Sequence, residues 1–167
     1  MRRFRLLILL SLISLSVTGV LARPAAATEP TKEPFGPDTT TVVVEDICSF
    51  PVTITAVNSG TQTTFLDQNG ALTRLHFYVV EQDTFTANGK SLTGLPYTFN
   101  LDVLFENGEV THIFGRGLSE RVPLPDGSVF LSAGRLDFAA HPGSMFLVVP
   151  DVGRSGNVAA LCAALAP

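Results

Sequence analysis

The chain has 167 residues, 46% of them apolar, and a formal net charge of −4 at pH 7. A chain of this length usually forms about one domain. Nucleic acids are bound through basic faces that neutralise phosphates, and 11 Lys and Arg against 15 Asp and Glu do not supply such a face. The composition therefore argues against a nucleic-acid-binding protein and against electrostatic attachment to anionic lipid.

The N-terminal segment has the three parts of a secretory signal peptide. Three arginines in the first five residues are followed by an apolar run over Leu6–Val17 and then by small residues. We expect residues 1–27 to be removed by cleavage after Ala27, with Ala22 as the second choice, and an uncleaved membrane anchor is the alternative. Cleavage removes four of the 11 basic residues and none of the 15 acidic ones, which leaves a net charge of −8. The mature protein is then expected to be secreted and extracellular, with no membrane anchor.

The segment after the signal peptide predicts a tether. Four prolines lie between residues 23 and 40, so residues 28–40 are expected to be flexible or extended. A single β domain is then predicted over residues 41–167. Cys48 and Cys162 are expected to form a disulfide between the start and the end of this domain, because exported proteins retain such bonds. Two buried free thiols are the alternative.

Turn signals recur at regular intervals through the middle of the chain. Asn-Gly or Asp-Gly pairs favour tight hairpins, and the glycines of four such pairs lie 19 residues apart. Each interval has room for two strands with a second turn between them, which gives about nine short strands in an up-and-down meander. The four pairs are Asn69-Gly70, Asn88-Gly89, Asn107-Gly108 and Asp126-Gly127. The second turns are expected at 81–83, 94–96, 115–117 and 133–134.

The strand patterns predict an all-β fold. Tyr97, Phe99 and Phe105 alternate with polar residues, as expected for a strand with one apolar face. A further short strand is expected over Ser144–Val149. An antiparallel meander can protect its edges by closing, or nearly closing, into a barrel of about eight or nine strands. A two-layer β-sandwich is the alternative architecture.

The C-terminus changes to a helical period. Val158, Leu161, Cys162 and Leu165 follow the spacing of one apolar helix face, which predicts a short helix over residues 156–165. Ser155 or Asn157 can cap its first turn. The helix is too short to be stable alone, so packing and the bridge to Cys48 are expected to hold it against the sheet.

Catalytic candidates are few. His76 lies between Arg74 and Tyr78 on the polar side of its predicted strand, and His112 shares a face with Val110, Phe114 and Arg116. The simpler interpretation places both histidines on an exposed or half-buried face. The alternative is a polar cavity in which His76 acts as a general acid or base and Arg74 holds a carboxylate. The sequence contains no metal-ligand spacing and no cofactor motif, so neither a metal nor a cofactor is predicted.

The sequence supports three functional hypotheses. The first is a barrel that binds a small apolar molecule, with Tyr97, Phe99 and Phe105 lining the site. The second is a solid structural or protein-interaction domain that binds another envelope protein through its surface. The third is a lumen enzyme of cyclase or isomerase type, which needs His76 or His112 to face inward. The sequence leaves the ligand and the oligomeric state open.

Two flanking segments carry a resemblance. Cys48-Ser49-Phe50-Pro51-Val52 and the helix from Ala160 to Leu165 resemble the ends of uncharacterised secreted actinobacterial all-β proteins with paired N- and C-terminal cysteines. The likeness covers residues 48–167. It implies an exported domain with paired cysteines, and it implies no activity and no catalytic residue.

Overall fold

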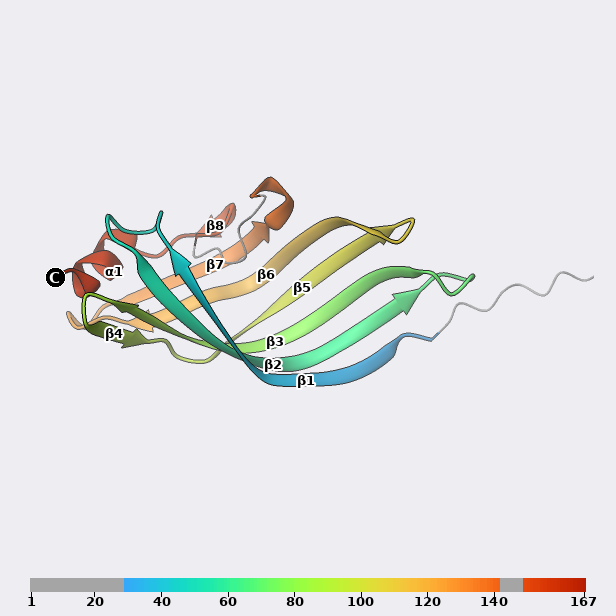
Figure 1. Cartoon of the computed structure of the whole chain (residues 1–167), viewed down its shortest axis with the longest axis horizontal. Helices are drawn as coiled ribbons and strands as arrows, with labels where there is room; N and C mark the ends of the chain where they lie inside the picture. Colours follow the sequence, from blue (N-terminus) through green and yellow to red (C-terminus); the bar gives the residue numbers. More distant parts are fainter. Residues whose placement is uncertain (1–28, 142–148) are drawn as a thin grey trace, which may run out of the picture.

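The computed structural model describes residues 29–141 and 149–167, which form one antiparallel sheet, a short 3₁₀ helix and an α-helix (Figure 1). The expected signal peptide and most of the strand expected over Ser144–Val149 lie outside the described residues. The sheet order is β1-β2-β3-β5-β6-β7-β8, and β4 also pairs with β3. The elements are β1 (Thr31–Val44), β2 (Val52–Leu66), β3 (Leu72–Ala87), β4 (Lys90–Thr93), β5 (Tyr97–Glu106), β6 (Glu109–Pro123), β7 (Val129–Asp137), η1 (Phe138–Ala140), β8 (Val152–Arg154) and α1 (Val158–Leu165).

The all-β fold and the antiparallel meander are confirmed. Each strand pairs with the next one in the chain, except that β4 and β5 both pair with the same edge of β3 and not with each other. All described strands belong to one sheet, so the two separate layers of a sandwich are not found in the described residues. Within these residues β1 and β8 remain the two edges of the sheet, and the sheet is open.

The predicted turns stand at alternating ends of the sheet (Figure 1). Asn88-Gly89 and Asn107-Gly108 each connect two paired strands, and all four residues have positive φ, as the tightest hairpins require. The other two turns are longer and use only a left-handed glycine. In one of them, the Asp67 carboxylate accepts hydrogen bonds from the backbone N–H groups of Asn69 and Ala71.

The predicted second turns were wrong, because each 19-residue interval holds one long strand, in one case interrupted. Residues 81–83 continue β3, and residues 115–117 and 133–134 lie within β6 and β7. Residues 94–96 form a break between β4 and β5, which both pair with β3. The glycines in these segments permit close approach of neighbouring strands. A Cβ on Gly134 would lie 2.1 Å from the carbonyl oxygen of Val152, a clash that only glycine avoids.

The predicted tether was also wrong over most of its length. Residues 31–40 belong to β1, which pairs with β2 from Thr31 opposite Thr64 to Val44 opposite Val52. Pro34 and Pro37 are compatible with this strand because β1 lies at the edge of the described sheet, where proline is tolerated. A register shift between Phe35 and Asp38 accommodates the irregular segment.

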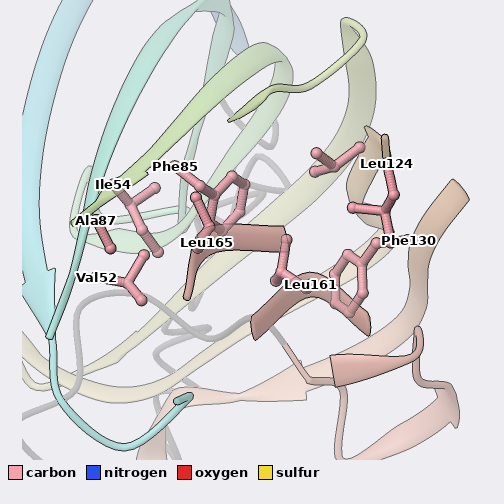
Figure 2. Close-up of a cluster of buried hydrophobic side chains, with 9 residues drawn as sticks. Val52, Ile54, Phe85, Ala87, Leu124, Phe130, Leu161 and Leu165 are labelled. Atoms are coloured by element: carbon pink, nitrogen blue, oxygen red, sulfur yellow. The ribbon is translucent and has the colours of Figure 1, made fainter. Parts of the chain in front are cut away.

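The predicted C-terminal helix is present and packs on one end of the sheet. It begins two residues later than expected, and Asn157 caps it by accepting a hydrogen bond from the backbone N–H of Ala160 at 3.1 Å. Leu161 and Leu165 project from α1 into a cluster of strand side chains (Figure 2). The other members of this buried core are Val52, Ile54, Phe85, Ala87, Val122 and Phe130 of the strands and Leu124 of the β6–β7 turn.

The predicted Cys48–Cys162 disulfide is confirmed and attaches α1 to the chain just before β2. At the C-terminal end of the helix, the Asn88 side chain donates a hydrogen bond to the carbonyl oxygen of Leu165 at 2.9 Å, and Lys90 contacts the carbonyl of Ala166. The helix is therefore fixed near its middle, at Cys162, and at its C-terminal end. Among the described residues, no helix has the length and apolar character needed to cross a membrane.

We predict that Leu161→Ala lowers the free energy of unfolding by about 2–5 kcal/mol, because the side chain is fully buried and its removal leaves a cavity. Urea denaturation with the disulfide intact measures this value. Leu95→Ala is the matched control, since Leu95 is 40% exposed, and it should cost less than about 1 kcal/mol. Equal losses in the two variants would show that α1 does not complete the core.

Candidate functional site

The face of the sheet that carries α1 also contains a pocket of about 320 Å³. Side chains alternate between the two faces of a strand, and we call the face bearing Phe77 and Phe99 the inner face. Both rings line the pocket, together with Leu101 of β5. Phe35 of β1 and Phe138 of η1 complete the aromatic lining. β1 lies at one end of the strand order, and η1 follows β7 near the other end. Because both contribute to the lining, the sheet curls far enough to bring its two ends around one pocket.

The pocket is hollow partly because glycines replace side chains on its wall. Gly115, Gly117 and Gly134 of β6 and β7 line it, and Gly117 is paired in register with Gly134. Gly115 would accept a side chain without a close contact, because the nearest atoms to an added Cβ lie at 3.9 Å. The helical end of the inner face is filled by the α1 core, so the available space lies beyond it.

A set of hydrogen-bonded polar side chains lies between the core and the pocket. Tyr97 of β5 is buried, and its hydroxyl oxygen lies 2.7 Å from Glu81 Oε1 and 2.6 Å from Asp83 Oδ2, both of β3. A phenol has one proton and can donate only one of these bonds at a time. The other short contact therefore needs a protonated carboxyl group that donates to the Tyr97 oxygen.

Two further buried polar groups lie deeper on the same face. Glu120 of β6 and Ser132 of β7 are paired in register, and both are almost fully buried. Within the described residues, neither carboxylate oxygen of Glu120 has a hydrogen-bond partner, nor do Asp83 Oδ1 and the Ser132 hydroxyl. We refer to Glu81, Asp83 and Glu120 as the acid cluster.

Burial keeps the acid cluster protonated to unusually high pH. It raises the pKa of Asp83 to about 7, to which repulsion from Glu81 contributes, while the hydrogen bond from Tyr97 opposes the shift. Burial and repulsion from Asp83 raise the pKa of Glu120 well above its usual range. Burial also raises the pKa values of Glu81 and Tyr97. None of the ion pairs among the described residues includes a member of the cluster.

Two of the three residues predicted to bind a ligand line the pocket, and the third does not. Tyr97 and Phe99 both line the pocket. Phe105 lies elsewhere, near the end of β5 beside the Asp67–Ala71 turn, and is not part of the pocket wall. Their role in binding a ligand stays a prediction.

The histidine candidates lie on the opposite, outer face. His76 is paired in register with Asp102, next to the inner-face pair of Phe77 and Leu101. His76 Nδ1 lies 3.0 Å from Asp102 Oδ1, and Arg116 Nη2 lies 2.5 Å from Asp102 Oδ2. Burial would raise the pKa of Asp102, but the hydrogen bonds from His76 and Arg116 bring it below its usual value.

The other catalytic candidates also face away from the pocket. Arg74 stacks on the Phe65 ring, with its guanidinium carbon 3.8 Å from the ring centroid, and Tyr78 is exposed. His112 Nε2 lies 3.5 Å from Asp137 Oδ2. The inward orientation that an enzyme based on His76 or His112 needs is therefore not found.

The acid cluster was missed in the sequence. Residues 81–83 looked like a turn because they are polar, whereas the period-two pattern from Phe77 through Val79 to Phe85 passes directly through Glu81 and Asp83. Continuing that pattern would have placed both carboxyl groups on the inner face. Glu120 follows a register shift in β6, so its orientation had no comparable signal.

Comparison with known proteins adds no assignment. No family model, no curated protein and no solved structure matches the chain. The function is therefore argued from the pocket and the acid cluster.

The raised pKa values predict that stability falls as the pH rises. A carboxyl group whose pKa is higher in the folded state holds a proton there that the unfolded state releases, so its contribution is lost between about pH 4 and pH 7. We expect the midpoint of thermal unfolding to be higher at pH 5 than at pH 8. Asp83→Asn should remove roughly 2–4 kcal/mol of this pH dependence.

Calorimetry between pH 5 and pH 8 measures this effect, in a range where ordinary carboxylates are ionised in both states. Asp38→Asn, an exposed substitution of the same kind, is the control and should leave the slope unchanged. A stability that rises with pH over this range, or an identical slope in Asp83→Asn, would contradict the assignment.

Proposed function

We propose that the chain is an exported β domain that binds a small apolar molecule in the pocket of the inner face. The pocket of about 320 Å³ carries this proposal, because small-molecule sites are concave, mostly apolar and supplied with a few polar groups. Phe35, Phe77 and Phe99 provide apolar walls, and Glu81 and Tyr97 provide polar groups at one end. The Cys48–Cys162 disulfide is consistent with the oxidising compartment that export would reach.

A nearly closed barrel is part of the same proposal. Phe35, Thr40 and Val42 of β1 line the same pocket as Leu136 of β7, although these strands lie at opposite sides of the sheet order. Such curvature supports a calyx that surrounds its ligand. A solid structural or envelope-binding domain would instead be expected to have a filled interior, and the pocket argues against that alternative.

A lumen enzyme is the second candidate. Its support is Glu81 at the pocket wall, since a carboxyl group with a raised pKa can act as a general acid near neutral pH. Such an enzyme would use Glu81 rather than a histidine. The proposed binding function needs only the pocket, and it is therefore tested first.

Filling the pocket should abolish binding. We predict that the purified domain binds 1-naphthylmethanol, and that Gly115→Leu weakens this binding by about tenfold or more because the new side chain occupies the pocket. Fluorescence titration of the naphthyl group measures the affinity. Tyr78→Leu, which changes the outer face, is the control and should bind as the unmodified protein does.

Native mass spectrometry of the domain from its own host tests the natural ligand. A non-covalent adduct that is present in the unmodified protein, absent from Gly115→Leu and lost on denaturation would support the proposal and give the ligand's mass. Equal affinity of the probe for the unmodified protein and Gly115→Leu, or no binding to either, would overturn it.

A further inference from the structure

We infer that the ligand of this pocket is an apolar molecule that carries a protonated amine, with the ammonium group held beside Glu81. This inference rests on the proposed function, which it makes more specific. Four observations support it: the position of Glu81 on the pocket wall, the buried polar atoms behind it, the lack of a cationic partner and the apolar remainder of the pocket.

Glu81 is the acidic side chain that reaches the pocket. It lines the wall together with Asn58 of β2 and Tyr97 of β5, so a carboxyl, an amide and a phenol meet at one end. Within the Glu81 carboxyl group, the Tyr97 hydroxyl contacts Oε1, and the Asn58 side chain also hydrogen-bonds to this carboxyl group. A carboxylate can accept about four hydrogen bonds, so Glu81 retains capacity for a ligand, and an alkylammonium group has three N–H donors to offer.

The polar atoms behind Glu81 are unusual for a protein interior. Asp83 and Ser132 are 0% exposed and Glu120 is 1% exposed, yet both oxygens of Glu120, Asp83 Oδ1 and the Ser132 hydroxyl have no hydrogen-bond partner among the described residues. Buried polar groups normally have such partners, and groups that lack them often mark functional sites. Asp83 and Glu120 also interact with each other, and once they have lost their protons their oxygens can only accept hydrogen bonds, so a further partner would then have to be a donor.

The charge around the pocket end favours a cation. The described ion pairs leave Glu81, Asp83 and Glu120 without an Arg, Lys or His partner. An ammonium group beside Glu81 would stabilise the ionised carboxylate, and the low polarity of the site would strengthen that attraction. Where Glu81 is ionised, it would instead repel a ligand carboxylate, so fatty acids and other organic acids are disfavoured at that pH.

The remaining wall selects for an apolar body and argues for an organic amine. Beyond the polar end the pocket is lined by Phe35, Phe77, Phe99 and Leu101. These side chains offer no ligand to an inorganic ion, and the described residues contain no cluster of three or more groups able to hold a metal. An amine attached to an aromatic or aliphatic body satisfies both ends of the pocket.

This arrangement makes binding depend on pH. Asn58 of β2, Glu81 of β3 and Tyr97 of β5 line the pocket, and so does Arg116 of β6, whose guanidinium group pairs with Asp102. Asp83, Glu120 and Ser132 are buried and are not part of the pocket wall. On β1, Asp38 is paired in register with Asn58 and is exposed. An ammonium ion needs a carboxylate, and the cluster loses protons as the pH rises toward neutrality. Affinity for an amine should therefore increase with pH, as long as the amine stays protonated.

Two probes of the same shape test the inference. We would compare 1-naphthylmethylamine with 1-naphthylmethanol by fluorescence titration, and 1-naphthoate serves as the anionic counterpart. At pH 8 the amine should bind about tenfold more tightly than the alcohol, since hydrogen bonds to charged groups are the stronger ones, and 1-naphthoate should bind most weakly. The ratio of amine to alcohol affinity should fall severalfold at pH 5, where the amine remains charged and the cluster is protonated.

Glu81→Gln tests the residue itself. The substitution retains size and removes the charge, so the ratio of amine to alcohol affinity should fall by about tenfold. Glu106→Gln, an exposed carboxyl at the end of β5, is the matched control and should keep the ratio of the unmodified protein. The pH dependence of the unmodified protein provides the same test if Glu81→Gln does not fold.

The outcomes separate this inference from the proposed function. If the alcohol binds and Gly115→Leu blocks it, but the amine has no advantage at pH 8, the pocket binds ligands and the amine inference is overturned. An advantage that persists in Glu81→Gln also overturns it. If neither probe binds, both proposals fail. An advantage that depends on Glu81 and on pH supports the inference.

Discussion

The docking of α1 on one end of the inner face determines what the rest of the sheet can do. A curled sheet with one apolar face must cover that face, and the helix covers only part of it. Leu161 and Leu165 fill the end formed by residues such as Phe85 and Phe130, and the disulfide and the contacts of Asn88 and Lys90 fix the helix there. Because a helix of eight residues has little stability alone, these tertiary contacts keep it in place. The part of the inner face that the helix does not reach is where the pocket lies.

The polar groups occur in the middle of the inner face, between the part that the helix covers and the part that forms the pocket. Along β3, the inward side chains pass from Phe77 and Val79 at the pocket, through Glu81 and Asp83, to Phe85 in the core. The acid cluster thus lies at the boundary between filled and hollow space. A rigid neighbour on the core side holds Tyr97 and the carboxyl groups in place, which is the support that a preorganised binding site needs.

The sequence predicted the hairpin turns, the helix and the disulfide, but it did not predict how long the strands are. Asn88-Gly89 and Asn107-Gly108 define hairpins through their backbone requirements, and the helix and disulfide follow from apolar spacing and cysteine count, so these local features were predictable. Polar residues and glycines within the sheet did not indicate where a strand ends. Residues 81–83 and the glycines of β6 and β7 resemble turns when each segment is considered alone, and only pairing with strands distant in sequence keeps them extended. The predicted Tyr97 and Phe99 line the pocket, whereas Phe105 shares their period but lies too far along β5 to reach it.

The acid cluster is difficult to explain as a device for stability. Leu or Ala at the positions of Asp83 and Glu120 would avoid the cost of burying carboxyl oxygens that lack hydrogen-bond partners, and the α1 core nearby shows that apolar residues pack well on this face. Of the three acids, Glu81 also lines the pocket, where a bound molecule can reach it. A residue whose burial weakens the fold is therefore the residue that would recognise the proposed ligand, as expected where function rather than packing determines a side chain.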